Sequence, residues 1–261
     1  MSPIPVSTTT NTIFALKDEI ASLHAQLDVE RTAKMEAETA LLMVDMAQEN
    51  GDPPPSRMAM IAGLAKLAES RDDDTGTHLS QIRHYTTSIA TAYSASNPEL
   101  LPLGEITIIG AASILHDIGK VGVSDDVLLH PGKFSDEQFS VMQQHTIIGA
   151  DILLALSEEI GNDPWIDTSI QIALAHHEKW DGNGYPFGLQ KENINLPARI
   201  VAVADVYDAL STKRIYKDAM SHEAAVEIIK GGRGSHFDPK VVDAFLAKAD
   251  EIKAVKGRLS R

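Results

Sequence analysis

Most of the chain carries the hydrophobic pattern of amphipathic helices. From residue 58 to about residue 246, apolar positions recur at three- and four-residue intervals with polar positions between them, which is the period of a helix packed on one face. Aromatic residues make up only 5% of the sequence, and runs typical of β-strands are few. The pattern therefore predicts an all-α domain. The predicted helices cover residues 58–69, 77–95, 105–117, 135–157, 168–178, 197–212, 222–230 and 239–248.

A further long helix is predicted before this domain, over residues 13–48. Its apolar residues keep the spacing of a coiled-coil seam at Ile13, Leu16, Ile20, Leu23 and Leu27. About two clean heptads are fewer than a coiled coil usually has, so the helix could also pack on its own domain. We favour a helix that pairs two chains, because a break with three prolines follows it. The chain would then divide into this helix with its linker, residues 1–57, and a helical domain, residues 58–261.

Composition narrows the class of protein. The chain has a net charge of −14 and no cysteine, which argues against DNA as a partner and excludes thiolate metal sites. We expect no membrane span, since no apolar run of about 20 residues is evident, and the N-terminus lacks the build of a signal peptide. The expected location is therefore the cytoplasm. The basic residues from 253 onward are expected to fray.

Five of the ten histidines stand out because carboxylates or other histidines accompany them. His78 lies four residues after Asp74, a spacing that places both side chains on one face of a helix. His145 is flanked by apolar residues, and Asp205 interrupts an otherwise apolar helix face. The remaining candidates are His116, Asp117, His176 and His177.

Taken singly, each of these residues has an ordinary explanation. A histidine on an apolar helix face usually bonds a backbone carbonyl, and an aspartate there usually caps a helix or joins an ion pair. As a set they are harder to satisfy, because buried imidazoles and carboxylates are expensive unless they are paired or bound to metal. One or two shared divalent cations would satisfy all of them, and these nitrogen and oxygen donors suit iron, manganese, zinc or nickel.

The order of several short motifs resembles that of a known family. "HDIGK" at 116–120 and "HHEKWDGNGYP" at 176–186 resemble the HD-GYP subgroup of the HD metal-dependent phosphohydrolases. The motifs "TGTH" at 75–78, "HTIIGADIL" at 145–153, "DVYDALSTKRIYK" at 205–217 and "GSHFDP" at 234–239 also fall in the family's order. The resemblance covers roughly residues 58–246 and implies an all-α domain of the HD type.

The resemblance implies a role for each candidate ligand. One metal ion would be held by His78, His116, Asp117 and Asp205, and Asp117 would bridge to a second ion held by His145, His176 and His177. Iron or manganese is the expected metal, with nickel or zinc as alternatives. Asp74 stands where a glutamate accompanies a third metal in some family members, and the shorter aspartate favours two ions while leaving a third open.

The activity implied by the resemblance is hydrolysis of the bacterial messenger cyclic di-GMP to linear pGpG, and in some members onward to GMP. Asp117 and Lys120 would then be catalytic, with Lys120 reaching the phosphate or the leaving oxygen. Arg214, Lys217 and Tyr185 would contact the substrate. Lys120 is also typical of a surface lysine at a helix C-terminus, but the resemblance favours its functional role. Arg214 and Lys217 are equally typical of a solvated helix end. Tyr185 could be hydrophobic filling, as could Trp180, a second candidate for the substrate wall.

Two other functions remain open at this point. The same ligand set would serve hydrolysis of another cyclic dinucleotide. Alternatively, the chain is a weakly active or inactive signalling module that binds metal and partner proteins, for example a diguanylate cyclase through the "GYP" loop. The implied ligand is cyclic di-GMP, and the implied partners are a cyclase and a second copy of this chain.

Overall fold

The computed structural model describes residues 77–161, 163–212 and 219–259, together with Gly63, Ala65, Lys66 and Ala68. The predicted helix over residues 13–48 and the division at residue 57 lie outside the described residues. The described residues form helices joined by turns, with an isolated bridge between Arg233 and Phe237 and no strand. The predicted all-α fold is therefore confirmed for this part of the chain.

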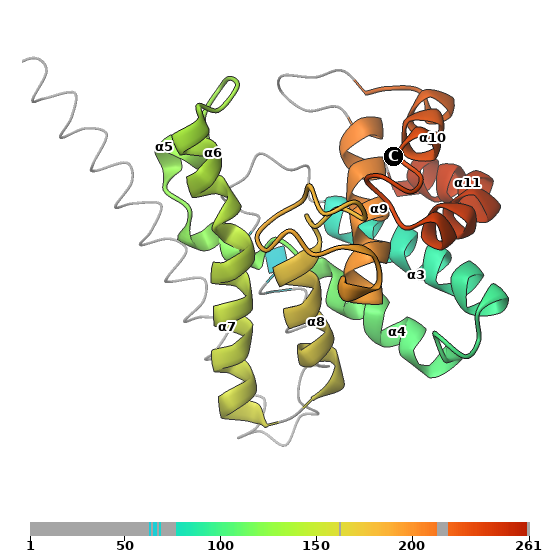
Figure 1. Ribbon diagram of the computed structural model, residues 1–261, viewed down its shortest axis with the longest axis horizontal. Coiled ribbons are helices and arrows are strands. Elements are labelled where there is room, and N and C mark those ends of the chain that lie inside the picture. The colour runs from blue at the N-terminus through green and yellow to red at the C-terminus, as the bar shows by residue number, and fades with distance from the viewer. Residues whose placement is uncertain are drawn as a thin grey trace, which may run out of the picture. The chain divides into compact units, whose positions relative to one another are not determined.

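The helices pack in two neighbouring sets. In chain order the described elements are α3 (His78–Ser96), α4 (Leu103–Ala112), η1 (Ser113–Leu115), η2 (Ile118–Gly122), α5 (Asp125–Leu128), α6 (Asp136–Gln143), α7 (His145–Ile160), α8 (Pro164–Ala175), η3 (Lys191–Asn193), α9 (Leu196–Ser211), α10 (His222–Gly231) and α11 (Pro239–Leu259). The elements named η are short 3-10 turns. Helices α7 and α8 lie side by side, and α11 packs on α3 and α9 (Figure 1).

Side chains at several helix starts explain where the helices begin. Ser135 accepts a hydrogen bond from the backbone amide of Gln138, and the Gln138 side chain accepts one from the amide of Ser135, which forms a capping box. Asp163 caps α8, whose first residue is Pro164, and Ser221 caps α10. These caps match the start predicted for α6 and for α10, while α8 begins four residues earlier than predicted.

The predicted helix over residues 135–157 is in fact two helices, because the chain breaks at Gln144 and α7 begins at His145. Within the described residues, the stretch Asp136–Glu159 is long and apolar enough, by length and composition alone, to cross a membrane. Core helices of soluble proteins pass the same test, so the expectation of no membrane span stays a prediction. In the fold this stretch is divided into α6 and α7, and Leu153 of α7 packs in a buried cluster.

Two helix ends also differ from the predicted ones. Helix α8 ends at Ala175 rather than at residue 178, so His176 and His177 follow it in a turn. Helix α11 continues to Leu259, whereas residues from 253 onward were expected to fray. Val255 is buried in the core, and this tertiary packing accounts for the longer helix.

Two groups of buried side chains hold the helices together. The first joins α3, α9, α10 and α11 and includes Tyr85, Tyr207 and Phe245. The second joins η1, η2, α7 and α8 and includes Leu115 and Leu153. Full burial of one such aliphatic or phenylalanine side chain contributes about 1.5–3 kcal/mol. Candidate ligands lie on elements of both groups, so the two groups together position the site.

A close backbone approach joins η2 to the start of α7. A Cβ atom on Gly119 would lie 1.9 Å from the carbonyl oxygen of His145 and 2.4 Å from the amide nitrogen of Gly149. Both of these atoms belong to the backbone, so no side chain fits there unless the two segments separate. Glycine at this position lets the turn that carries Asp117 lie directly against the start of α7.

Gly119→Ala should therefore lower the free energy of unfolding by about 2 kcal/mol or more, which is the usual cost of overpacking a core. Urea unfolding followed by circular dichroism should show a lower midpoint. Gly104→Ala is the matched control, because a Cβ atom at Gly104 of α4 meets nothing within 4 Å, and alanine is favoured over glycine in a helix by about 0.5–1 kcal/mol. Equal midpoints for the two variants would contradict the close approach.

Candidate metal centre

Segments far apart in the sequence bring seven candidate ligands into two neighbouring groups. One group consists of Asp117, His145, His176 and His177, and the other of His78, His116 and Asp205. Within each group, one donor atom from every residue lies within 4.8 Å of the donor atoms of the others. Asp117 connects the groups, because its Oδ2 atom also lies 3.3 Å from Nε2 of His116. The structure thus brings together the residues predicted as ligands, while their binding of metal stays a prediction.

Most of these side chains extend from the ends of helices. His78 is the first residue of α3, His145 is the first residue of α7, His116 and Asp117 form the turn between η1 and η2, and His176 and His177 follow α8. Asp205 alone comes from the middle of a helix, α9. At a helix end the backbone leaves its regular path, so neighbouring side chains can turn toward a common point.

Backbone carbonyls orient three of the histidine rings. Nδ1 of His116, His145 and His176 lies 2.9, 2.7 and 3.0 Å, respectively, from a carbonyl oxygen three or four residues earlier in the chain. A carbonyl oxygen can only accept, so each ring donates from Nδ1, and Nε2 is the nitrogen that is left for another partner. All three Nε2 atoms lie within 3.5 Å of the Asp117 carboxylate. This is the arrangement of histidines that bind metal through Nε2.

Asp208 is a buried carboxylate that sequence reasoning missed. Its Oδ2 atom lies 2.8 Å from Nδ1 of His78, and only 1% of the residue is exposed. A carboxylate that accepts the second ring proton of a histidine fixes the ring and makes its other nitrogen a stronger ligand. The available signal was spacing, because Asp208 lies three residues after Asp205 and therefore on a neighbouring part of the same helix face.

The carboxylate of Asp117 lies among cationic and hydrogen-bonding groups. Its Oδ2 lies 3.0 Å from Nζ of Lys120, and its Oδ1 lies 3.3 Å from Nε2 of His145 and 3.5 Å from Nε2 of His176. Burial alone would raise the pKa of Asp117, but the nearby Lys120, His116 and His145 hold this pKa well below its usual range. The carboxylate is therefore ionised, as a metal ligand must be.

The donor atoms of the site fit divalent cations. Nε2 of His116 and Oδ1 of Asp117 are buried and have no hydrogen-bond partner among the described residues. Burial, followed by the nearby rings of His176 and His145, lowers the pKa of His177 well below its usual value, so this ring is neutral at pH 7. Neutral nitrogens and an ionised carboxylate that face one another are satisfied by a cation between them. Iron, manganese, zinc and nickel all accept such a set.

Tyr185 forms an aromatic wall beside the second group. Its ring stacks on the ring of His177, with centroids 4.7 Å apart, and meets Phe139 of α6 edge-to-face at 5.9 Å. Burial, with a further contribution from the charge of Asp117, raises the pKa of Tyr185 far above its usual value, so the phenol keeps its proton. Phe139 is partly exposed, and the two aromatic rings therefore border the metal centre on the solvent side.

A second missed residue holds the loop that carries Tyr185. Glu178 is 2% exposed, and its two carboxylate oxygens accept hydrogen bonds from the backbone amides of Phe187, at 2.8 Å, and Leu189, at 3.0 Å. Glycine is required at position 184, where the loop passes directly over the backbone of Glu178, because a Cβ atom there would lie 2.5 Å from Cα of Glu178. Glu178 thus folds the loop back on the end of α8 and fixes the position of Tyr185.

Three residues predicted for the site, Asp74, Arg214 and Lys217, lie outside the described residues. The roles predicted for them stay predictions. The described chain leaves α9 at Thr212 and resumes at Ala219, and the backbone amide of the next residue, Met220, donates to the carbonyl of Leu210 at 3.0 Å. The segment with Arg214 and Lys217 therefore begins and ends at the C-terminal end of the helix that contributes Asp205.

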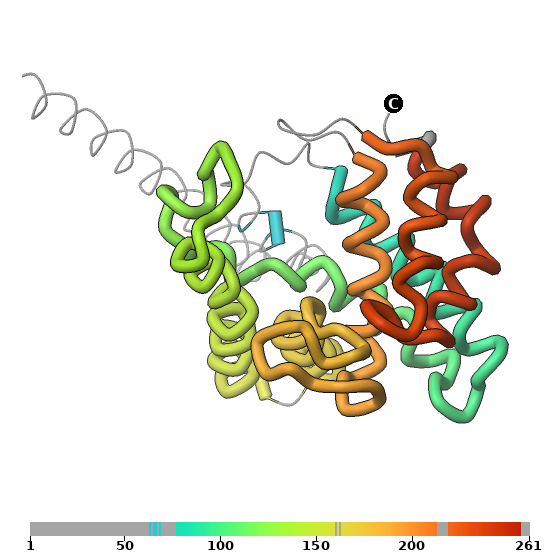
Figure 2. The backbone as a smooth tube through the Cα atoms, turned by 45° about the horizontal axis from the view of Figure 1, so that its top comes forward, coloured from blue at the N-terminus to red at the C-terminus, as the bar shows by residue number. Residues whose placement is uncertain are grey.

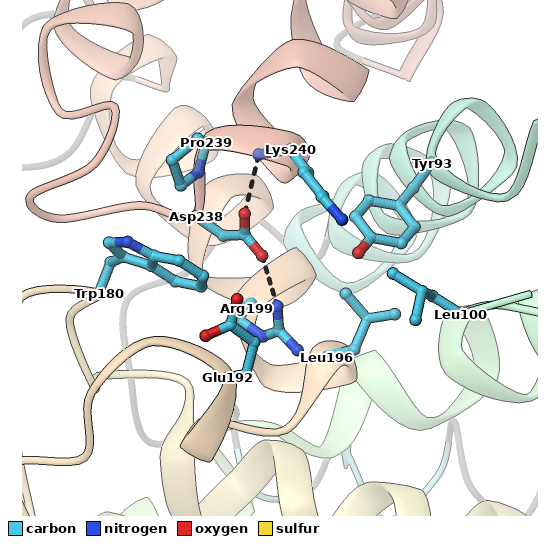
Figure 3. A pocket seen from close by; sticks show the side chains of 9 residues that line it. All are labelled: Tyr93, Leu100, Trp180, Glu192, Leu196, Arg199, Asp238, Pro239 and Lys240. Carbon is cyan, nitrogen blue, oxygen red and sulfur yellow. Dashed lines mark hydrogen bonds and ion pairs between the residues drawn. The ribbon is translucent and has the colours of Figure 1, made fainter. Parts of the chain in front are cut away.

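Trp180 lies in a separate cavity of about 520 Å³ that contains no candidate metal ligand among its lining residues. The guanidinium of Arg199 lies 5.7 Å from the centroid of a Trp180 ring and forms an ion pair with Asp238 (Figure 3). Leu196 and Pro239 form apolar parts of the same cavity (Figure 3). This position does not support the suggested role of Trp180 in the substrate wall.

Comparisons with known proteins agree with the motifs. A family model described as HD domain matches residues 16–241. A Vibrio cholerae protein named cyclic di-GMP phosphodiesterase is 46% identical over 203 residues, which cover 77% of this chain and 41% of that protein. The Xanthomonas campestris cyclic di-GMP phosphodiesterase response regulator RpfG is 39% identical over 77% of this chain and 50% of its own length. A Vibrio cholerae 3'3'-cGAMP-specific phosphodiesterase 2 is 35% identical over 84% of this chain and 38% of its own length.

A solved structure shares the fold. The crystal structure of a Vibrio cholerae cyclic GMP-AMP-specific phosphodiesterase matches with a TM-score of 0.52 at 19% sequence identity, over 78% of this chain and 53% of that chain. At this identity the likeness shows the fold alone. The curated relatives are longer, because the chain spans between 38% and 50% of the three named here.

Asp117→Ala should remove most of the metal from the protein, because it deletes a carboxylate that contacts donors of both groups. The measurement is elemental analysis per chain after anaerobic purification, with circular dichroism to verify folding. Asp151→Ala, which replaces an exposed aspartate of α7, is the matched control and should keep the wild-type content. Full metal content in Asp117→Ala would show that this carboxylate is not shared between ions.

Asp208→Asn should weaken metal binding by about 10–100-fold, the usual effect of changing the outer partner of a metal-ligating histidine. The amide keeps the size of the side chain but removes the charge that makes His78 a stronger ligand. Competition with a chelator measures the dissociation constant. The control Asp243→Asn removes a carboxylate that pairs with Arg233 at the surface and should leave the dissociation constant unchanged. Wild-type affinity in Asp208→Asn would contradict the role given to this carboxylate.

Proposed function

Because this chain belongs to the HD-GYP family of HD domains, we propose that it is a metal-dependent phosphodiesterase that hydrolyses cyclic di-GMP to linear pGpG. The observation that carries the proposal is the gathering of five histidines, Asp117 and Asp205 in two neighbouring groups of donors, which Asp117 connects through its contact with His116. Relatives named for this activity are up to 46% identical to the chain. Further hydrolysis to GMP is proposed as a second, slower step.

The ligand set divides between two ions in this proposal. His78, His116, Asp117 and Asp205 would hold one ion, and Asp117, His145, His176 and His177 would hold the other. Iron or manganese is the proposed metal, and Asp74 leaves room for a third ion. Two divalent ions in such a site activate a water molecule and neutralise charge on the phosphate oxygens. The chain's own part is to hold the rings toward the centre before substrate binds. Backbone carbonyls hold Nδ1 of His116, His145 and His176, and the Asp208 carboxylate holds Nδ1 of His78.

Lys120 is the residue best placed to act on the phosphodiester itself. Its ammonium lies 3.0 Å from Oδ2 of Asp117, and 18% of its side chain is exposed, so it reaches the centre from the open side. From there it can donate a hydrogen bond to a phosphate oxygen or to the leaving ribose oxygen, where negative charge develops. Its largely buried position beside Asp117 favours this role over that of a solvated lysine.

Cyclic di-GMP is preferred over other cyclic dinucleotides because relatives that are 46% and 43% identical to the chain carry that activity in their names. The second candidate is 3'3'-cGAMP, because a relative 35% identical to the chain is named for it. Arg214 and Lys217 are proposed to bind the substrate phosphates, and Tyr185 to contact a base. The side chains of Arg214 and Lys217 would supply local positive charge for an anionic substrate, which the net charge of −14 otherwise repels.

Other parts of the proposal concern the whole protein. We place it in the cytoplasm, where its proposed substrate occurs. Pairing of two chains through residues 13–48 and contact with a diguanylate cyclase stay predictions. A signalling module that binds metal without turnover is the alternative from another class, and the ionised Asp117 beside Lys120 favours the enzyme.

A direct turnover assay tests the proposal. Protein purified anaerobically and analysed for metal should convert cyclic di-GMP to pGpG, identified by chromatography, faster than it converts 3'3'-cGAMP. Faster turnover of 3'3'-cGAMP would identify that compound as the substrate and leave the proposed phosphodiester hydrolysis unchanged. Full metal content without turnover of either compound would favour the signalling module.

Lys120→Met should lower kcat by about 100-fold or more, as removal of one donor to a developing negative charge does, while metal content stays at the wild-type level. The matched control is Lys230→Met, because Lys230 is an exposed lysine at the end of α10, and it should retain full activity. An unchanged kcat in Lys120→Met would show that this lysine has no catalytic role and is an ordinary lysine at a helix end. A loss of metal in this variant would instead make it a structural support of Asp117.

A further inference from the structure

A chain of polar contacts leads from the metal centre to the last helix. Oδ2 of Asp208 bonds Nδ1 of His78 at 2.8 Å, and Oδ1 of the same carboxylate accepts a bond from the Thr212 hydroxyl at 3.3 Å. Nζ of Lys256 in turn donates to the Thr212 hydroxyl at 3.0 Å and to the Ser211 hydroxyl at 2.6 Å. The Lys256 ammonium only donates, the Asp208 carboxylate only accepts, and the Thr212 hydroxyl between them does both, so donors and acceptors match along these contacts.

Lys256 is placed by the packing of α11. The preceding residue, Val255, is buried in the core with Ile252, and α11 runs beside α3 and α9 (Figure 2). Lys256 itself is partly buried. Its ammonium lies over the last residues of α9, where a positive charge is favoured by the helix dipole. Burial lowers the pKa of Lys256, and the negative charge of Asp208 opposes that shift.

We propose that Lys256 is a positioning residue of the metal centre, which orients His78 through Thr212 and Asp208. The proposal rests on the metal centre of the proposed function but not on the identity of the substrate. With Lys256 bonded to both hydroxyls, Thr212 is held with its hydroxyl toward Asp208, and the carboxylate is held against the His78 ring. The last helix of the chain thereby acts on a ligand contributed by the first residue of α3.

The same contact holds one end of the segment with Arg214 and Lys217. Thr212 is the last residue described before that segment, and Met220 is anchored to Leu210 after it. Lys256 therefore fixes the point from which the proposed substrate-binding residues leave α9. Lys256 lies beyond residue 241, where the match to the HD domain ends.

Lys256→Met should raise the dissociation constant for Mn²⁺, measured by chelator competition, by about tenfold, the lower end of the range for outer partners of a ligand. Lys253→Met is the matched control on the same helix, because Lys253 is exposed and pairs with Glu223 at the surface, and it should bind as the wild type does. Lys256→Arg retains donors for both hydroxyls and should restore most of the affinity. Thr212→Val interrupts the same chain at another point and should reproduce the loss.

A double-mutant cycle decides whether the effect passes through Asp208. In the Asp208→Asn background, Lys256→Met should cause no further loss of Mn²⁺ affinity. Wild-type affinity in Lys256→Met and Thr212→Val, or an undiminished loss in the Asp208→Asn background, would overturn the proposal. Because the readout is binding of Mn²⁺ alone, absence of cyclic dinucleotide hydrolysis in the wild type would refute the proposed function and leave this test intact.

Discussion

The carboxylate of Asp117 is the group around which the rest of the site is arranged. It is largely buried, it is ionised, and its two oxygens face the imidazoles of His116, His145 and His176. An ionised carboxylate in such a place is stable only where positive charge compensates it. Lys120 supplies one positive charge at 3.0 Å, but the neutral ring of His177 supplies none. The ion pair with Lys120 leaves Nε2 of His116 and Oδ1 of Asp117 buried without a hydrogen-bond partner among the described residues, and divalent cations between the rings and the carboxylate would satisfy both atoms.

The fold keeps these donors in place mainly through the backbone. Three rings bond a carbonyl of the preceding turn, so their orientation is set by where a helix begins or ends rather than by other side chains. Gly119 lets the turn with Asp117 touch the start of α7, and Glu178 folds the next loop over the end of α8. A site built this way needs little rearrangement when ligands bind, because the ordering was completed when the core formed. The arrangement of the donor atoms and the stability of the fold therefore depend on the same short segments.

The sequence allowed the helical fold and the seven clustered residues to be predicted, because helical periodicity and the order of short motifs are local signals. It did not reveal the break at Gln144, because apolar spacing continues from α6 into α7. Glu178 and Asp208 were missed for another reason: each looks like an ordinary surface acid, and only tertiary contacts show that its carboxylate is buried and paired. Lys256 was read as part of a fraying end, because nothing local shows that α11 packs against α9.

The relatives suggest how one metal centre can serve different cyclic dinucleotides. Proteins named for cyclic di-GMP and for 3'3'-cGAMP are both similar to this chain over more than three-quarters of its length. These substrates share the phosphodiester and differ in a base, so residues that contact only metal and phosphate cannot distinguish them. Discrimination must come from groups farther out, where Tyr185 and Phe139 border the centre and the segment after Thr212 begins. In the proposed enzyme, the buried donors would then determine that a phosphodiester is cleaved, and the outer aromatic and basic residues would determine which one.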